Sequence, residues 1–209
     1  MIIKVCGMRD PSNIAAVANC GPDMMGMIFY EGSERFVNEA IVPEEVLAGA
    51  EGQTFVGVFV NATIDGVMDT TERYQLGIVQ LHGDESPAYC RELRDEGMKV
   101  IKAIPVASEQ DLTKCDEYSN SVDLFLFDTK SALRGGSGKK FNWDVLGTYD
   151  GETPFLLSGG IGPGDVEAIL QVRHPGLYGV DINSGFEVEP GVKDVEAVRE
   201  FIIELRGES

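Results

Sequence analysis

The 209-residue sequence has few of the side chains on which metal sites and histidine-based catalysis depend. It contains two histidines, His82 and His174, and its cysteines include no Cys-x-x-Cys pair. Zinc sites and Ser-His-Asp triads draw on such residues. We therefore expect neither of them, and scattered cysteines fit reduced thiols in a cytosol. The four cysteines are Cys6, Cys20, Cys90 and Cys115.

Positive charge is scarce as well, with 17 Lys and Arg residues against 35 Asp and Glu and a formal net charge of −18. A surface of this sign repels nucleic acid and anionic lipid, so we expect neither as a partner. No apolar run approaches the roughly 20 residues that a membrane span needs, and no charged-then-apolar leader opens the sequence. We expect a cytoplasmic protein, and its charge slightly favours a monomer over a homodimer.

Eight short apolar runs rich in β-branched residues recur along the chain. Their hydrophobicity is nearly continuous, which is typical of strands covered on both faces, whereas strands with one wet face alternate. The predicted strands span residues 2–6, 24–29, 54–60, 78–81, 100–104, 124–127, 154–157 and 177–182.

Segments with helical spacing separate these runs and follow the last one. Capping residues and prolines open several of them, as at Ser86-Pro87, and glycine closes the same segment at Gly97. The predicted helices span residues 11–17, 43–50, 64–74, 86–97, 108–115, 142–148, 163–172 and 195–205.

The alternation of eight strands with eight helices predicts parallel strands joined by crossover helices. At this length the count fits one closed (β/α)8 barrel, a TIM barrel, that spans residues 1–209 as a single domain. A doubly wound open sheet is the alternative. In a barrel the chemistry takes place where strands end and helices begin, so the candidate site residues are those at the strand ends.

A thiol and a carboxylate stand at two of these strand ends. Cys6 closes the first strand, where it is either a small buried hydrophobe or a thiol that acts as a base or nucleophile. Asp128 follows the apolar run 124–127, where it can act as a general acid or cap the next loop. The other cysteines lie in predicted helices and are expected to be core residues.

Further polar residues follow other strands. Gln80 and His82 lie at the end of the fourth strand, and His82 either faces a ligand or is satisfied within its own turn. Asp181 lies in the eighth strand. Because strand ends meet at one rim of a barrel, we expect these side chains to converge with Cys6 and Asp128.

Turns that contain glycine follow the seventh and eighth strands. Barrels often bind a phosphate there on backbone N–H groups, and small residues let the oxyanion approach. A further glycine-rich segment, 134–140, lacks the P-loop spacing and is expected to be a mobile lid or a loop that faces the phosphate. The predicted phosphate-binding residues are Gly159, Gly160, Ser184 and Gly185.

Seven motifs in sequence order resemble the phosphoribosylanthranilate isomerase family and together cover nearly the whole chain. Each is modest alone, but all seven at predicted strand ends are specific. The resemblance implies a small phosphorylated substrate and no cofactor or metal. The motifs are KVCGM at 4–8, GVFVN at 57–61, VQLHG at 79–83, FDT at 127–129, GGSGK at 135–139 with FNW at 141–143, LSGGI at 157–161 and GVDINSG at 179–185.

The reaction that this resemblance implies is an Amadori rearrangement in tryptophan biosynthesis, from N-(5′-phosphoribosyl)anthranilate to 1-(o-carboxyphenylamino)-1-deoxyribulose 5-phosphate. Cys6 matches the general base of the family, and Asp128 matches its general acid. Asp128 would protonate the furanose ring oxygen, so that the ring opens to a Schiff base. The Cys6 thiolate would then remove the C2′ proton to give an enolamine, which tautomerises to the ketone.

The resemblance also implies substrate contacts. Arg35 matches the family arginine that pairs with the anthranilate carboxylate, a task suited to a bidentate guanidinium. Its segment, 30–36, departs from the more basic, proline-containing version of many relatives, and Glu31 and Glu34 should weaken the attraction for an anion. Asp181 matches a position that accepts a hydrogen bond from a substrate hydroxyl, and anchoring its own loop is an equal alternative.

Two other classes of protein fit these residues less well. Indoleglycerol-phosphate synthases rely on a catalytic lysine and glutamate, and a histidine-pathway isomerase uses an aspartate where Cys6 stands here. A non-catalytic barrel that only binds phosphate would have no need of Cys6 and Asp128 together. A turnover assay separates that class from the isomerase.

Overall fold

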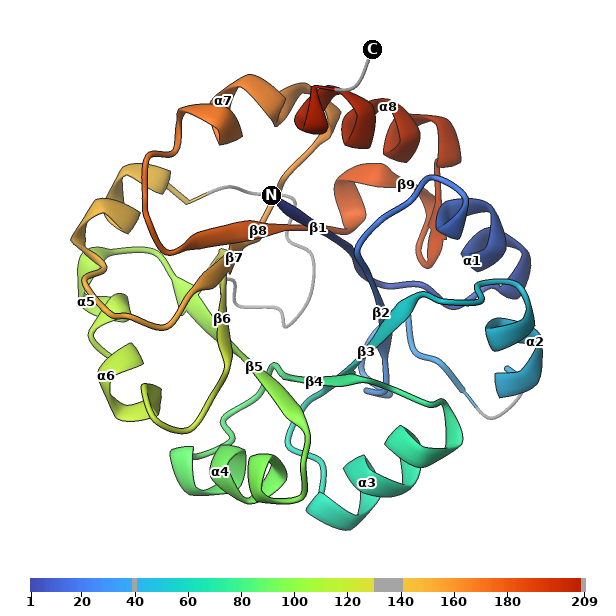
Figure 1. Cartoon of the computed structure of the whole chain (residues 1–209), viewed down its shortest axis with the longest axis horizontal. Helices are drawn as coiled ribbons and strands as arrows, with labels where there is room; N and C mark the ends of the chain where they lie inside the picture. Colours follow the sequence, from blue (N-terminus) through green and yellow to red (C-terminus); the bar gives the residue numbers. More distant parts are fainter. Residues whose placement is uncertain (39–40, 130–140, 208–209) are drawn as a thin grey trace.

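Eight parallel strands form a closed barrel in the computed structural model, which describes residues 1–38, 41–129 and 141–207 (Figure 1). β1 pairs with β2 and also with β8, and this second pairing, with Lys4 opposite Asp181, closes the ring. The predicted (β/α)8 barrel is confirmed, and the open sheet is excluded. The strands are β1 (Ile2–Val5), β2 (Met24–Ile28), β3 (Thr54–Phe59), β4 (Ile78–Leu81), β5 (Lys99–Val106), β6 (Leu124–Thr129), β7 (Phe155–Leu157) and β8 (Leu177–Ile182).

Helices surround the barrel on the outside (Figure 1). Side-chain caps fix where several of them begin: Asp10 accepts a hydrogen bond from Asn13 N, and Ser86 accepts one from Tyr89 N. None of the helices in the described residues is long and apolar enough to cross a bilayer. The α-helices are α1 (Pro11–Ala18), α2 (Pro43–Ala48), α3 (Ile64–Arg73), α4 (Pro87–Asp95), α5 (Glu109–Leu112), α6 (Cys115–Tyr118), α7 (Val166–Gln171) and α8 (Val195–Arg206), and the 3-10 helices are η1 (Trp143–Thr148), η2 (Pro163–Asp165) and η3 (Ser184–Phe186).

Three predicted helices differ from the observed ones. The segment 163–172 opens with the 3-10 helix η2, so the α-helix α7 begins only at Val166. In the segment 108–115 the helix α5 ends at Leu112, and α6 begins only at Cys115 and continues beyond the prediction to Tyr118. Thr113, between the two helices, donates its hydroxyl to Gln110 O, a local bond that competes with a continuous helix. The segment 142–148 contains the 3-10 helix η1 rather than an α-helix. Gly147 and Thr148 are poor helix formers, and short connecting segments often take the tighter 3-10 form.

A small hairpin between β8 and α8 was not predicted. It consists of the antiparallel strands β9 (Glu187–Glu189) and β10 (Val192–Lys193), joined through Gly191, whose φ of 87° suits a glycine. Asn13 of α1 holds it in place, because its side chain bonds both to the N–H and to the carbonyl of Lys193.

The alternation of side chains along each strand separates two apolar layers. The larger layer, which includes Ile3 and Val5, lies between strands and helices. Successive side chains of a strand point to opposite faces, so Lys4 and Cys6 point into the barrel. The pocket described below therefore lies above the small inner layer, which consists of Val56, Ile78, Ile101, Ala103, Leu124, Leu126 and Leu156.

Candidate active site

A pocket opens at the carboxyl ends of the barrel strands, as the fold predicts. Eight of the ten predicted site residues line it, and the two that do not are Arg35 and Gly185. The eight are Cys6, Gln80, His82, Asp128, Gly159, Gly160, Asp181 and Ser184; the other lining residues are Ile28, Tyr30, Ser33, Val58, Val60, Ser158, Ile161 and Asn183.

Cys6 lies directly after β1 and is buried. Its N–H donates to Ile182 O of β8 over 2.8 Å, which extends the β1–β8 ladder by one residue. The chain then turns at Gly7, where φ is 75° and a Cβ would lie 2.5 Å from Asn183 Oδ1, so this turn requires glycine. Burial raises the pKa of the Cys6 thiol, while the positive charge of Lys4 acts in the opposite direction.

Lys4 and Asp181 form a buried ion pair beneath Cys6. Lys4 Nζ donates to Asp181 Oδ1 over 2.8 Å, and Ser158 Oγ donates to the other carboxylate oxygen over 3.4 Å. Asp181 therefore joins β8 to β1 rather than only anchoring its own loop. Lys4 was missed as a site residue, although a lysine two places before Cys6 in an apolar run must share the inward face of the strand.

Asp128 meets His82 across the pocket. Asp128 Oδ2 lies 3.3 Å from His82 Nε2, and Oδ1 accepts a hydrogen bond from Thr129 N over 2.8 Å. On the other side of the imidazole, Gln80 Nε2 lies 3.1 Å from His82 Nδ1. A donation from the amide to Nδ1 places the proton of a neutral ring on Nε2, facing Asp128. His82 thus faces the pocket, and Gln80 Oε1 is buried without a hydrogen-bond partner in the described part of the chain.

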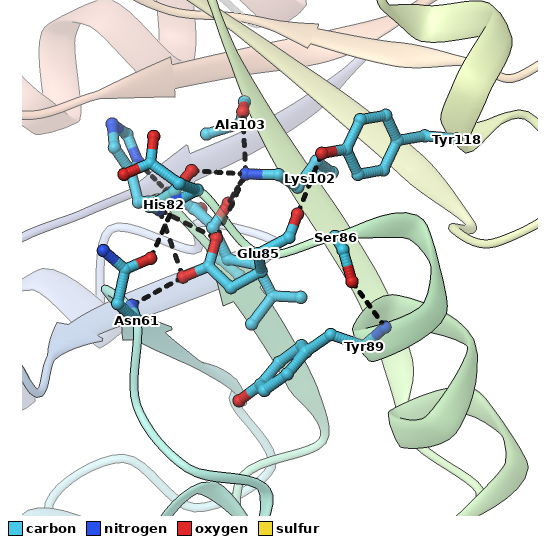
Figure 2. Close-up of polar contacts among 12 residues, drawn as sticks. Asn61, His82, Glu85, Ser86, Tyr89, Lys102, Ala103 and Tyr118 are labelled. Carbon is cyan, nitrogen blue, oxygen red and sulfur yellow. Dashed lines mark hydrogen bonds and ion pairs between the residues drawn. The ribbon is translucent and has the colours of Figure 1, made fainter.

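A second buried ion pair holds the loop that carries His82 (Figure 2). Lys102 Nζ of β5 lies 3.1 Å from Glu85 Oε2 and donates to the carbonyls of Leu81 and Gly83 on either side of His82. Glu85 also accepts hydrogen bonds from the N–H groups of Asn61 and Gly83. The loops after β3 and β4 are therefore tied to β5 beneath His82.

Arg35 forms an ion pair with Glu187 of the β9–β10 hairpin. Its Nη2 lies 2.6 Å from Glu187 Oε2 and its Nε 2.9 Å from Oε1. Lys193 Nζ contacts the same carboxylate over 2.6 Å and also Asn183 Oδ1 over 2.7 Å. The acid that neutralises Arg35 is thus Glu187 and not one of the glutamates in its own loop, a partner 152 positions away that no local sequence pattern indicates.

The two glycine turns have the close backbone packing that small residues allow. Gly159 and Gly160 have φ values of 90° and 68°, and a Cβ at Gly185 would clash with the carbonyl of Ile161. The N–H groups of Gly160 and Ser184 have no acceptor among the described residues, which leaves them available to an anion. The predicted lid 134–140 lies outside the described residues.

The arrangement defines a (β/α)8-barrel enzyme that has a thiol and a carboxylate on separate walls of one pocket, beside backbone N–H groups suited to an oxyanion. No cluster of three or more His, Cys, Asp or Glu residues suited to a metal ion occurs within the ranges that the structure covers.

Comparisons with known proteins agree with one another. The family model for N-(5′-phosphoribosyl)anthranilate (PRA) isomerase matches residues 3–204. The N-(5′-phosphoribosyl)anthranilate isomerase of Parabacteroides distasonis is 50% identical over 206 residues, covering 98% of this chain and 93% of the relative. The same enzyme of Phocaeicola vulgatus is 45% identical over 208 residues, covering 99% and 98%. The crystal structure of the Thermotoga maritima enzyme superimposes with a TM-score of 0.86 at 32% identity, covering 99% and 100%.

The chain belongs to the N-(5′-phosphoribosyl)anthranilate isomerase family. It is therefore an isomerase of the intramolecular oxidoreductase class that acts in tryptophan biosynthesis. The resemblance of the seven sequence motifs to this family is confirmed.

Proposed function

We propose that this chain rearranges N-(5′-phosphoribosyl)anthranilate with Cys6 as general base and Asp128 as general acid. The observation that carries this assignment is the position of the two groups, which line one pocket from β1 and β6, far apart around the barrel. A phosphoribosyl anthranilate isomerase structure that is 31% identical, with a TM-score of 0.85 over 99% of this chain and 100% of that one, contains reduced 1-(o-carboxyphenylamino)-1-deoxyribulose 5-phosphate. A substrate of that kind suits a pocket with the acid on one wall and the base on another.

The proposed reaction moves protons and needs no electron acceptor. Asp128 gives its proton to the furanose ring oxygen as the bond from that oxygen to C1′ breaks, which leaves a Schiff base. The Cys6 thiolate takes the proton from C2′, and the resulting enolamine tautomerises to the ketone. His82, which contacts Asp128, is placed to orient the carboxyl group.

We also propose how the other predicted site residues contact the substrate. Gln80, with its unpartnered buried oxygen, His82 and Asp181 face the substrate, and the phosphate binds at the two glycine turns. For Arg35 to bind the anthranilate carboxylate, its guanidinium must share or exchange Glu187 as its partner.

We further propose that the whole chain is one catalytic domain and works as a monomer in the cytoplasm. The charge of −18 supports the monomer, although a Thermotoga maritima relative is described as dimeric. Light scattering at micromolar concentration decides between the two states, because a dimer has twice the mass.

The decay of anthranilate fluorescence on adding purified protein to freshly made N-(5′-phosphoribosyl)anthranilate tests the function. We expect rapid decay without added metal, and a kcat lower by about 10²–10⁴-fold in Cys6→Ala, because a proton-transfer group is removed. Cys20→Ala is the matched control, since Cys20 lies outside the pocket. Full turnover by Cys6→Ala would move the base elsewhere, and no decay with any variant would exclude this substrate.

A further inference from the structure

Lys4 is a charged residue beneath the pocket that the proposed reaction does not use. Its side chain is completely buried in the barrel beneath the pocket. An ammonium group carries three N–H donors, yet the only oxygen acceptor of Lys4 among the described residues is Asp181 Oδ1. Lys102, which is equally buried, contacts four oxygen acceptors. Lys4 therefore has hydrogen-bonding capacity that its ion pair does not use.

The thiol of Cys6 is the other polar group beside this ammonium. A Cβ placed on Gly26 of β2 would lie 2.8 Å from Cys6 Sγ and 3.1 Å from Lys4 Nζ. Both atoms thus lie against the same glycine, within about 6 Å of each other. Burial alone would lower the pKa of Lys4, but the negative charges of Asp181 and Cys6 outweigh burial and raise it. The lysine consequently stays charged where a thiolate would form.

Other charged groups also act on Cys6. Asp181 on β8 opposes ionisation of the thiol, whereas Lys193 on β10 favours it. Arg35, in the loop after β2, interacts with Cys6 as well, but Lys193 and Arg35 both share the carboxylate of Glu187. Asp128 and His82 face the same pocket from its other walls. Among the described residues Lys4 contacts one oxygen acceptor, whereas Lys193 contacts two, so Lys4 has more donors to spare.

We propose that Lys4 is a positioning residue for the reaction: its ammonium, held by Asp181, stabilises and orients the thiolate of Cys6 that takes the C2′ proton. The use of that thiolate rests on the proposed function. The ionisation itself does not, because the thiol releases its proton to water in the free enzyme. Lys4 contributes a fixed positive charge and no bond to the substrate.

The pH dependence of Cys6 alkylation by iodoacetamide tests this role without relying on turnover. Only the thiolate reacts, so the midpoint of the rate reports its ionisation, and mass spectrometry of the peptide that contains Cys6 separates it from the other cysteines. We expect Lys4→Met to raise the midpoint by about 1–3 pH units, as the loss of a neighbouring opposite charge does. Asp181→Asn should shift it in the opposite direction.

Lys102→Met is the matched control, because it also removes a buried, ion-paired lysine, but one on β5. It should leave the Cys6 midpoint unchanged, and circular dichroism verifies that each variant is folded. If Lys4→Met does not fold, the alkylation midpoint of Asp181→Asn alone tests the proposal. An unchanged midpoint in Lys4→Met, or a midpoint in Asp181→Asn that is unchanged or raised, would overturn the proposal.

The two proposals can fail separately. If the midpoints shift as expected and Cys6→Ala still turns over substrate, Lys4 tunes a thiol that is not the base. If the midpoints do not shift and Cys6→Ala is inactive, the proposed function stands and the role of Lys4 falls.

Discussion

Two of the buried lysine–carboxylate pairs in the described residues, Lys102–Glu85 and Lys4–Asp181, differ in how many hydrogen bonds their groups make. Lys102 and Glu85 bind each other, three carbonyl groups and two N–H groups, and they connect the loops after β3 and β4 to β5 (Figure 2). Lys4 and Asp181 connect β1 to β8 on the far side of the ring, and Asp181 Oδ1 is the one oxygen acceptor of Lys4 among the described residues, beside the thiol of Cys6. We call a buried pair saturated when its donors and acceptors are taken up by neighbouring protein groups, and such a pair holds its surroundings in place. An unsaturated pair keeps a donor that can interact with a reacting group.

The largest effect on stability should come from breaking the saturated pair. Lys102→Met leaves Glu85 buried without its counterion, so we expect the free energy of unfolding to fall by about 3–5 kcal/mol. Urea denaturation at pH 7 measures this change. Lys99→Met, on the exposed neighbour in β5, should change it by no more than about 0.5 kcal/mol. Equal stability of the two variants would show that the Lys102 network is not structural.

A smaller effect, on rate, should come from filling the space beside the unsaturated pair. Gly26→Ala introduces a Cβ against both Cys6 Sγ and Lys4 Nζ, and we expect kcat to fall by about 10²-fold because the base is displaced. Steady-state kinetics measures this. Gly77→Ala is the control, since the nearest atom to its Cβ would be 3.8 Å away. An unchanged kcat in Gly26→Ala would mean that the sulfur tolerates displacement.

The smallest effect concerns Glu187, which links the hairpin to the site through Arg35 and Lys193. Burial alone would raise the pKa of Glu187, but the hydrogen bonds from Arg35 and Lys193 and the charge of Lys193 lower it below its usual 4.5. Glu187 therefore contributes stability above about pH 4.5, and this contribution is lost as the pH falls through the lowered value.

Glu187→Gln removes the titrating group, so its free energy of unfolding should fall less steeply below pH 4.5 than that of the unmodified protein. Urea denaturation between pH 3 and 7 gives both slopes. Glu204→Gln, at an exposed position of α8, should retain the original slope. A steeper slope in Glu187→Gln would reverse the sign of the argument.

The strand ends were predictable because continuous apolar runs mark parallel strands and the barrel fold brings their ends together. Cys6, Gln80, Asp128 and Asp181 follow from that rule alone. The pairing of Arg35 with Glu187 was not predictable, since 152 positions separate the two residues and the strands of the hairpin are only three and two residues long. Whether a buried lysine is saturated depends on which backbone carbonyls of nearby loops point toward it. The periodicity of side chains in the sequence does not indicate the direction of those carbonyls.

The steady-state kinetics of Asp128→Asn tests most directly whether an acid and a base act across one pocket. The amide keeps the shape of the side chain but cannot deliver the proton that opens the ring. We expect kcat to fall by about 10²–10⁴-fold with little change in KM, and Asp116→Asn, at an exposed position, to keep its full kcat. A kcat for Asp128→Asn close to that of the unmodified protein would contradict the assignment of Asp128 as the acid.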